Sequence, residues 1–271
     1  MAFFDDEHAR EIDAAAIYEQ TAEPLTAQCI SRAFEMVGGI VPSMRVLDVA
    51  AGPGALSVAA AHCGARVLAT DISATMVARI SERLAPYPRC AARVMDAQAF
   101  DLDDDGVDAT FSMFGVINLP DWRQALREMA RVTRRGGWGC VSSWRDPTAV
   151  ASVGLLVEAM AEEFPDQEPI AVSEGVSVAA DLGALRQEVA AAGFEDVSVL
   201  PVEVAWDFPS ADEFVAKLDR VYGFMPAYVG LSAEDRQRLK PALRRAAERR
   251  AGADGVLHAP STAHLAAGRV I

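Results

Sequence analysis

Two hydrophobic periods alternate along the first half of the chain. Short apolar runs, typical of buried strands, are followed by stretches whose apolar residues recur every three or four positions, as on one face of a helix. Strands that alternate with helices indicate a mostly parallel, doubly wound sheet, so the expected fold class is α/β. The pattern predicts strands at 45–50, 66–70, 90–95, 107–113 and 137–143, and helices at 55–63, 73–84 and 121–133.

The segment 121–133 carries the helical signals most fully. Asp121 is a residue type that caps helix N-termini, and Gln124 stands three positions later, as in a capping box. The pair Gly136–Gly137 is expected to end this helix. The apolar residues between recur at the spacing of one buried face: Trp122, Ala125, Leu126, Met129 and Val132.

Outside this alternation the pattern changes at both ends. A helical stretch is predicted over 13–37, kinked at Pro24 and stopped by a glycine pair at 38–39. After Trp144, residues 145–180 contain three prolines and no strong period, which predicts an inserted cap. The remaining expected elements are a helix at 182–192, a strand at 197–204, helical material at about 210–250 and a last strand within 263–271.

The composition excludes several classes of protein. With 271 residues, of which 51% are hydrophobic, the chain can bury a large core. No uncharged apolar run reaches the roughly 18 residues of a membrane helix, and the acidic N-terminus does not resemble a secretory signal, so we expect a cytoplasmic protein without stable membrane association. The net charge of −14 argues against nucleic acid as a partner. The four cysteines show no C-x-x-C spacing, which argues against a disulfide framework or a zinc site.

A glycine turn stands between the first predicted strand and the helix that follows it. The segment reads VLDVAAGPGAL over 46–56, and Gly52 and Gly54 allow a close approach that side chains would block. A ligand can then lie at the carboxyl end of the strand, against the N-terminus of the helix.

Three kinds of ligand use such a loop. A phosphate-binding loop requires a lysine after the glycines, and none follows here. A dinucleotide loop requires a third glycine, but Ser57 stands in its place, and Pro53 lacks an N–H for a pyrophosphate. S-adenosylmethionine carries no phosphate, and its sulfonium and amino group are cationic, so the acid Asp48 inside the strand fits this third ligand.

Acids further along the chain agree with this choice. Asp71 ends the second strand, where its carboxylate can accept bonds from two ribose hydroxyls. Asp96 follows the third strand, where it can accept a bond from an adenine amino group beside the N–H of Ala97. Met76 lies one turn into the next helix, in a position to pack against the adenine ring.

As a set, these segments resemble those of class I S-adenosylmethionine-dependent methyltransferases, within the small-molecule group that includes the ubiquinone/menaquinone-biosynthesis type. The resemblance covers about 40–205 and is specific only as a set. It departs from the family at Ala50, where glycine is common, and at Ala51, where cysteine or glycine is common. The matching segments are VLDVAAGPG, ATDISATMV, VMDAQAF, FSMFGVINLPDW, RVTRRGGWGCVSSW and LRQEVAAAGFEDVSV.

The resemblance implies a Rossmann-like seven-stranded sheet whose last strand is antiparallel, together with helical lid elements. It implies one domain over 1–271, with N-terminal lid helices at 1–39, a cofactor-binding half at 40–145, an inserted cap at 145–180 and a C-terminal half at 181–271. S-adenosyl-L-methionine is then the cofactor and S-adenosyl-L-homocysteine its product. The expected cofactor-binding residues are Asp48, Ala50, Gly52, Gly54, Asp71, Ile72, Met76, Asp96, Ala97, Met113 and Phe114.

Two further motifs point away from other functions. The acidic run 101–105 resembles the start of a calcium loop, but Ser112 stands where that loop requires glutamate, so no metal is expected. The segment at 118–121 resembles the N-P-P-aromatic motif of nucleic-acid methyltransferases without its second proline or its aromatic residue. Asn118 is the only asparagine in the sequence and stands just beyond the fourth predicted strand, on the expected acceptor side, so it is kept as a candidate contact to a small acceptor.

The acceptor side carries only weak candidates. Residues that could contact the acceptor are Tyr18, Asn118, Trp144 and Tyr222, and those that could act in catalysis are Tyr18, Asn118, His258 and His264. The apolar residues of the expected lid suggest a hydrophobic or aromatic metabolite. The alternative is that these residues form the core of the cap: Phe164, Trp206, Phe208, Phe214, Phe224 and Met225.

The main hypothesis is methyl transfer to a small molecule by in-line displacement, driven by proximity and desolvation, in a monomer or homodimer. One alternative is a protein that binds the cofactor without transferring its methyl group. The other is a nucleotide-dependent oxidoreductase, for which the sequence lacks both a Y-x-x-x-K pair and the third glycine.

Overall fold

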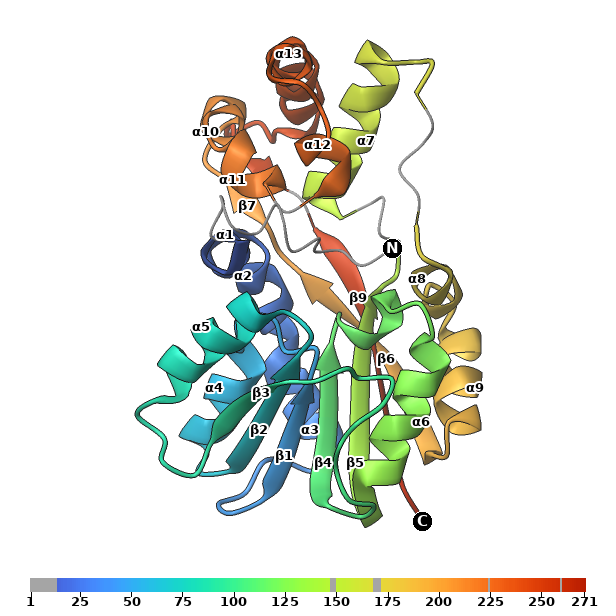
Figure 1. Ribbon diagram of the computed structural model, residues 1–271. Coiled ribbons are helices and arrows are strands. Elements are labelled where there is room, and N and C mark those ends of the chain that lie inside the picture. Colours follow the sequence, from blue (N-terminus) through green and yellow to red (C-terminus); the bar gives the residue numbers. More distant parts are fainter. Residues whose placement is uncertain (1–13, 147–149, 168–171, 224, 259) are drawn as a thin grey trace. The chain divides into compact units, whose positions relative to one another are not determined.

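The computed structural model describes residues 14–146, 150–167, 172–223, 225–258 and 260–271 (Figure 1). These residues fall into two compact units. Unit 1 comprises the described residues of Met1–Arg145, Ser173–Val202 and Ala263–Ile271, and unit 2 those of Asp146–Val172 and Glu203–Thr262. The two predicted insertions thus supply unit 2 together, whereas residues 173–180, predicted as part of the cap, belong to unit 1. The single-domain organisation stays a prediction.

In the described part of the chain, seven strands of unit 1 form one sheet in the order β3-β2-β1-β4-β5-β9-β6. The pairs β1–β2, β1–β4, β2–β3 and β4–β5 are parallel, and β9 pairs antiparallel with β5. This topology confirms the predicted Rossmann-like sheet with its antiparallel last strand. The strands are β1 (Arg45–Val49), β2 (Arg66–Asp71), β3 (Ala91–Val94), β4 (Val107–Met113), β5 (Thr133–Trp144), β6 (Glu195–Val204) and β9 (Ser261–Arg269).

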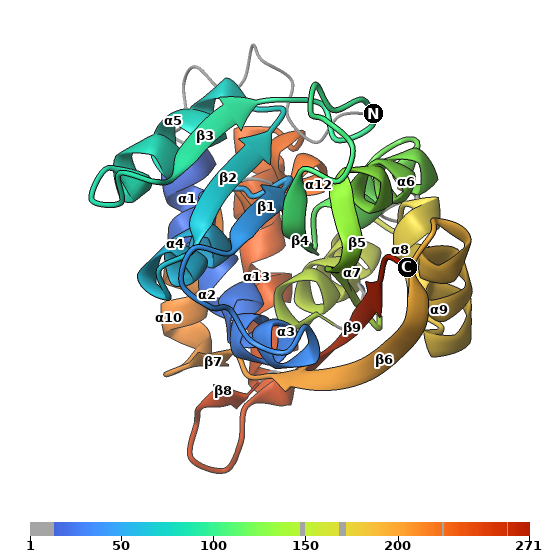
Figure 2. The same cartoon turned by 90° about the horizontal axis from the view of Figure 1, so that it is seen from below.

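Both faces of the central strands are covered by helices, as the apolar runs in the sequence require. Leu47 and Val49 of β1 lie in the core beneath α6, α8 and α9. On the opposite face Phe111 of β4 meets Phe34 of α3 edge-on, with ring centroids 5.6 Å apart. Figure 2 shows α3 and α4 on one side of the sheet and α6 and α9 on the other. The helices of unit 1 are α1 (Ala14–Thr21), α2 (Glu23–Thr26), η1 (Ala27–Cys29), α3 (Ile30–Met36), α4 (Ala55–His62), α5 (Ala74–Leu84), η2 (Val116–Asn118), α6 (Trp122–Val132), α8 (Glu174–Ala179) and α9 (Leu182–Ala191).

Helix α6 begins as predicted but ends earlier. The Asp121 carboxylate accepts a bond from the backbone N–H of Gln124 at 3.0 Å, which caps the helix. The helix stops at Val132 because Thr133 already has extended backbone angles and starts β5. The prediction that the glycine pair at 136–137 ends it was therefore wrong. Gly137 lies inside β5, where a Cβ would come within 2.7 Å of a side-chain carbon of Thr133, so glycine serves a close approach there.

Unit 2 is helical and has its own apolar core. Its longest helices, α7 and α13, are joined by ion pairs that include Arg245–Glu162 and Arg249–Glu158. Phe164, Trp206, Phe208, Phe214 and Met225 pack into or against this core, while Phe224 lies outside the described residues. The elements are α7 (Ala151–Glu163), β7 (Asp207–Phe208), α10 (Ala211–Ala216), α11 (Leu218–Tyr222), α12 (Pro226–Val229), α13 (Ala233–Arg250) and β8 (Leu257–His258).

Among the described residues, no helix combines the length and apolarity needed to cross a bilayer. Likewise, no three acidic, histidine or cysteine side chains within the described ranges gather as metal ligands.

Candidate functional site

The loop from Ala50 to Gly54 joins β1 to α4 and has an unusual backbone. Gly52 and Gly54 have φ angles of +56° and +92°, in the left-handed region that glycine tolerates. Ala50 also has a positive φ, +51°, although it carries a side chain. The loop therefore follows a path that costs conformational energy at Ala50, as is common where a backbone is shaped for a ligand.

Gly115, beyond the end of β4, makes room for the Ala50 side chain. A Cβ on Gly115 would lie 2.6 Å from the Cβ of Ala50 and 2.8 Å from its carbonyl oxygen. Phe114, just before it, also has a positive φ of +61°. The carboxyl ends of β1 and β4 are therefore fitted to each other at these positions, and the departure from the family at Ala50 is accommodated by this glycine.

Asp71, the last residue of β2, is buried and holds the glycine loop. Its Oδ2 accepts a hydrogen bond from the Gly52 N–H at 2.9 Å, and its Oδ1 accepts one from the Ser73 N–H at 2.9 Å. Burial raises the pKa of Asp71, and these backbone bonds oppose that rise. Each carboxylate oxygen keeps a further lone pair for a hydroxyl donor.

Asp48 lies deeper, in the middle of the first strand. Its side chain is turned to the α4 face of the sheet, where its Oδ2 accepts a bond from the Ser57 hydroxyl at 2.6 Å. Only 2% of the residue is exposed, and the resulting desolvation raises its pKa to about 7. Ser57, which stands in place of a third glycine, was not predicted as a site residue. The one feature of the sequence that could have indicated it is a polar residue in the first turn of an otherwise apolar helix.

The ends of β2 and β3 lie side by side, because the Met95 N–H donates to the Asp71 carbonyl at 3.0 Å. Asp96 is exposed, and its Oδ1 accepts a bond from the Gln98 N–H at 2.8 Å, while Ala97 is buried. After β2, Ile72 is 59% exposed, whereas Met76 is 2% exposed. This edge thus offers an accepting carboxylate and an exposed apolar side chain close to Asp71.

An aromatic pair stands at the ends of β4 and β5. The Phe114 and Trp144 rings are stacked, with centroids 4.4 Å apart and planes 30° apart. The Phe114 N–H donates to the Ser142 hydroxyl at 3.0 Å, and its carbonyl accepts from the Asn118 amide nitrogen at 2.7 Å. Asn118 therefore braces the turn that follows Met113, the last residue of β4, and Ser142 of β5 is a further contact of this turn that was not predicted.

Tyr18 of α1 reaches the glycine loop from the N-terminal segment. Its ring Cε1 lies 3.8 Å from the point that a Cβ on Gly52 would occupy. Burial, followed by the charges of Glu23 and Asp71, raises the pKa of Tyr18 to about 12. The phenol is therefore neutral at pH 7 and can donate or accept a hydrogen bond.

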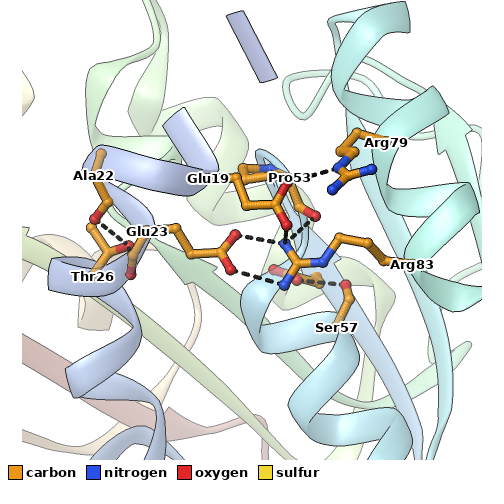
Figure 3. A network of polar contacts seen from close by, with 9 residues as sticks. Glu19, Ala22, Glu23, Thr26, Pro53, Ser57, Arg79 and Arg83 are labelled. Carbon is orange, nitrogen blue, oxygen red and sulfur yellow. Dashed lines mark hydrogen bonds and ion pairs between the residues drawn. The ribbon is translucent and has the colours of Figure 1, made fainter. Parts of the chain in front are cut away.

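Ion pairs tie this N-terminal segment to α5 (Figure 3). The Arg83 guanidinium binds both carboxylate oxygens of Glu23, at 2.7 and 2.8 Å, and also donates to the Pro53 carbonyl at 2.9 Å. Arg79, one turn earlier, donates to Glu19 at 2.7 Å. None of these residues was predicted, because only the fold brings 19–23, 53 and 79–83 together.

The remaining candidates make contacts of their own. His264 of β9 is buried in unit 1, with Nδ1 3.0 Å from the Ala179 carbonyl. Tyr222 and His258 belong to unit 2. The Tyr222 hydroxyl donates to the Ser152 carbonyl at 2.7 Å, and the two ring nitrogens of His258 lie 3.0 and 3.2 Å from Asp207 and Asp254. Each of the three side chains thus has a structural partner.

Comparison with known proteins assigns this arrangement to a family. A family described as a methyltransferase domain matches residues 46–137. A demethylmenaquinone methyltransferase of Mycolicibacterium gilvum is 34% identical over 165 residues, which cover 58% of this chain and 70% of that protein. An uncharacterized protein of Mycobacterium tuberculosis is 38% identical over 133 residues, which cover 49% of this chain and 47% of that protein.

The fold comparison agrees. The YcgJ protein of Bacillus subtilis superposes with a TM-score of 0.55 at 15% identity, covering 90% of this chain and 98% of that one. The chain spans about half the length of the first curated relatives that it matches. The chain belongs to the class I S-adenosylmethionine-dependent methyltransferase family.

Proposed function

We propose that this protein transfers the methyl group of S-adenosyl-L-methionine to a small hydrophobic or aromatic metabolite. The observation that carries the proposal is the bond from the Gly52 N–H to Asp71, which places a buried carboxylate directly beside a glycine loop of left-handed backbone. The loop lacks the lysine of a phosphate-binding loop, and Pro53 removes one of the backbone N–H groups that would bind a phosphate. A ligand with ribose and cationic groups suits it better.

The cofactor would extend along the carboxyl ends of the first strands. The free lone pairs of Asp71 would accept bonds from the ribose hydroxyls, and the exposed Ile72 side chain would cover one face of the adenine, with Met76 beneath. Asp96 and Ala97 would meet the adenine edge. Ala50, Gly52, Gly54, Met113 and Phe114 would surround the methionine end, and Asp48 would contribute negative charge below the loop. S-adenosyl-L-homocysteine would leave from the same site, and no metal takes part in this proposal.

An aromatic acceptor is supported by two observations. The stacked Phe114–Trp144 pair offers an aromatic surface at the ends of β4 and β5, next to the loop. The relative from Mycolicibacterium gilvum is named for methylating demethylmenaquinone. We therefore place the acceptor beside Trp144 and the turn braced by Asn118, and we expect a phenol, a quinol or a comparable ring compound.

Methyl transfer requires mainly that the protein align the cofactor and the acceptor. When bound, the cofactor supplies a methyl group on a sulfonium: an acceptor lone pair forms the new bond to carbon while the carbon–sulfur bond breaks and its electrons return to sulfur. The protein would hold the two groups in line and exclude water. Tyr18, neutral at pH 7, would donate or accept a hydrogen bond at the loop. Neither His258 nor His264 is assigned as a base, and the cytoplasmic location and the monomeric or dimeric state stay predictions.

The test is turnover with methyl-labelled cofactor across phenols, quinols, amines and carbon acids. We expect a labelled product from a ring compound, dependent on the protein and lost in Asp71→Ala. Cofactor binding without any labelled product would favour the protein that binds but does not transfer. Reduction or oxidation of a nicotinamide cofactor in the same samples would favour the oxidoreductase instead.

A further inference from the structure

One cation lies where the N-terminal helices, the glycine loop and α5 meet. Arg83 is only 20% exposed in its side chain, and its partner Glu23 13%. The bidentate bond to Glu23 and the bond to the Pro53 carbonyl engage one planar guanidinium in two directions (Figure 3). Lysine cannot reproduce such a geometry, because its ammonium is a point charge.

Helix α5 contacts the glycine loop closely. Gly54 packs on α5, since a Cβ at Gly54 would lie 3.1 Å from side-chain carbons of Ile80, one turn before Arg83. Arg83 then fixes the adjoining Pro53 carbonyl. Because proline has no N–H, this carbonyl is the only backbone hydrogen-bonding group that residue 53 offers. Helix α5 thus holds the loop at two successive residues.

The other end of the contact is the N-terminal segment. Glu19 and Glu23 lie on either side of the turn between α1 and α2, and Tyr18 immediately precedes Glu19. The Arg83 guanidinium binds Glu23 and lies 3.8 Å from Glu19, so it anchors both α1 and α2 directly behind Tyr18, whereas the Arg79–Glu19 pair is more exposed. The position of the Tyr18 ring next to Gly52 follows from this anchoring.

We propose that Arg83 is a positioning residue of the cofactor site, which fixes the Pro53 carbonyl and the α1–α2 segment to one another and thereby holds Tyr18 against the glycine loop. This inference rests on the proposed function for the identity of the ligand. Arg83 itself makes no contact with the ligand; it acts through Tyr18 and the loop.

The test compares Arg83→Met with Arg79→Met. Arg79 lies on the same helix and binds the same segment, but no contact with the loop accompanies its bonds to Glu19 and Glu82. We expect Arg83→Met to weaken S-adenosyl-L-methionine binding by about tenfold or more and to raise the KM for the cofactor, with kcat at saturation within about twofold of the wild type. Arg79→Met is expected to change affinity by less than about threefold. Arg83→Lys should bind the cofactor almost as weakly as Arg83→Met, because the lysine ammonium cannot form the bidentate bond to Glu23.

A second readout needs no ligand. Amide hydrogen exchange of α1 and α2 is expected to accelerate in Arg83→Met, while exchange in β4 and β5 stays at the wild-type rate. Equal affinity losses in the Arg83 and Arg79 variants, or unchanged exchange in α1 and α2, would overturn the positioning role. If the wild type does not bind the cofactor but the exchange result holds, the proposed function fails and the anchoring stands.

Discussion

Burial of Asp48 makes the stability of the protein depend on pH in a specific window. The carboxyl has an ordinary pKa of 3.8, which folding raises to about 7 because desolvation outweighs the bond from Ser57. Below pH 3.8 the Asp48 carboxyl is protonated in both the folded and the unfolded chain, so its burial imposes no ionisation cost on folding. Between the two values only the unfolded chain ionises, so folding becomes less favourable as pH rises, by about 1.4 kcal/mol for each pH unit.

The magnitude follows from these two values. The cost reaches about 4 kcal/mol above pH 7, and about 2.5 kcal/mol of it develops between about pH 5 and pH 8. Asp48→Asn removes the ionisation but keeps an oxygen that accepts the Ser57 hydroxyl. The variant should therefore gain about 2.5 kcal/mol in unfolding free energy relative to the wild type between these two pH values.

Urea unfolding followed by circular dichroism at several pH values measures this difference. Asp96→Asn is the matched control, since it makes the same chemical change at an exposed carboxylate that follows β3. Parallel stability curves for the wild type and Asp48→Asn would refute the reasoning, because they would mean that the Asp48 carboxyl has the same pKa in both states.

Three further predictions concern the loop and the surface of unit 2. Ala50→Gly should stabilise the fold by up to about 1 kcal/mol by relieving the positive φ, whereas Gly115→Ala should destabilise it by about 2 kcal/mol or more through the clash with Ala50; thermal unfolding of both variants checks this. Asp71→Asn should weaken cofactor binding by at least about tenfold without loss of the far-UV spectrum, and calorimetry with unchanged affinity would contradict the ribose contact. Asp254 and Asp207 raise the pKa of His258, so the charge of its imidazolium stabilises the fold at pH values below about 6.5. This contribution is lost as pH rises through the higher pKa of the folded state, so the melting temperatures of the wild type and His258→Gln should converge with rising pH. A constant difference between the two melting temperatures would argue against this role of His258.

Most of the sheet could be predicted because its central strands are buried on both faces and alternate with helices. Each of the strands expected in unit 1 is present, with ends shifted by a few residues. The glycine pair at 136–137 misled the prediction because glycine marks a helix end and a crowded strand with the same residue type. Only the structure shows Asp108 and Thr133 crowding Gly137.

The inserted segments were harder to interpret. Helix α7 lies in the segment 145–180, for which no strong period was found, since its apolar and small residues surround the helix instead of following one stripe. Ion pairs join it to α13. Of the two interpretations left open for the aromatic residues of the expected lid, the described residues follow the second, because they pack into or against the core of unit 2. A hydrophobic pattern reports burial but not the surface against which a side chain is buried.

The candidate site likewise contains residues that the sequence could locate and contacts that it could not. The acids at the strand ends could be located from the sequence because parallel strands end at one edge, and Asp71 indeed meets the glycine loop there. Ser57 beneath Asp48, Gly115 beside Ala50, and Arg83 at Pro53 depend on tertiary contacts between distant segments. No local pattern encodes such pairings.

The central claim is that the glycine loop and Asp71 bind S-adenosyl-L-methionine. Isothermal titration calorimetry with S-adenosyl-L-methionine and S-adenosyl-L-homocysteine, and with NAD and NADP as controls, tests it most directly. The account predicts binding of the first two compounds with dissociation constants on the order of micromolar, and no heat from the dinucleotides. Binding of a dinucleotide, with no response to either sulfur compound, would contradict it.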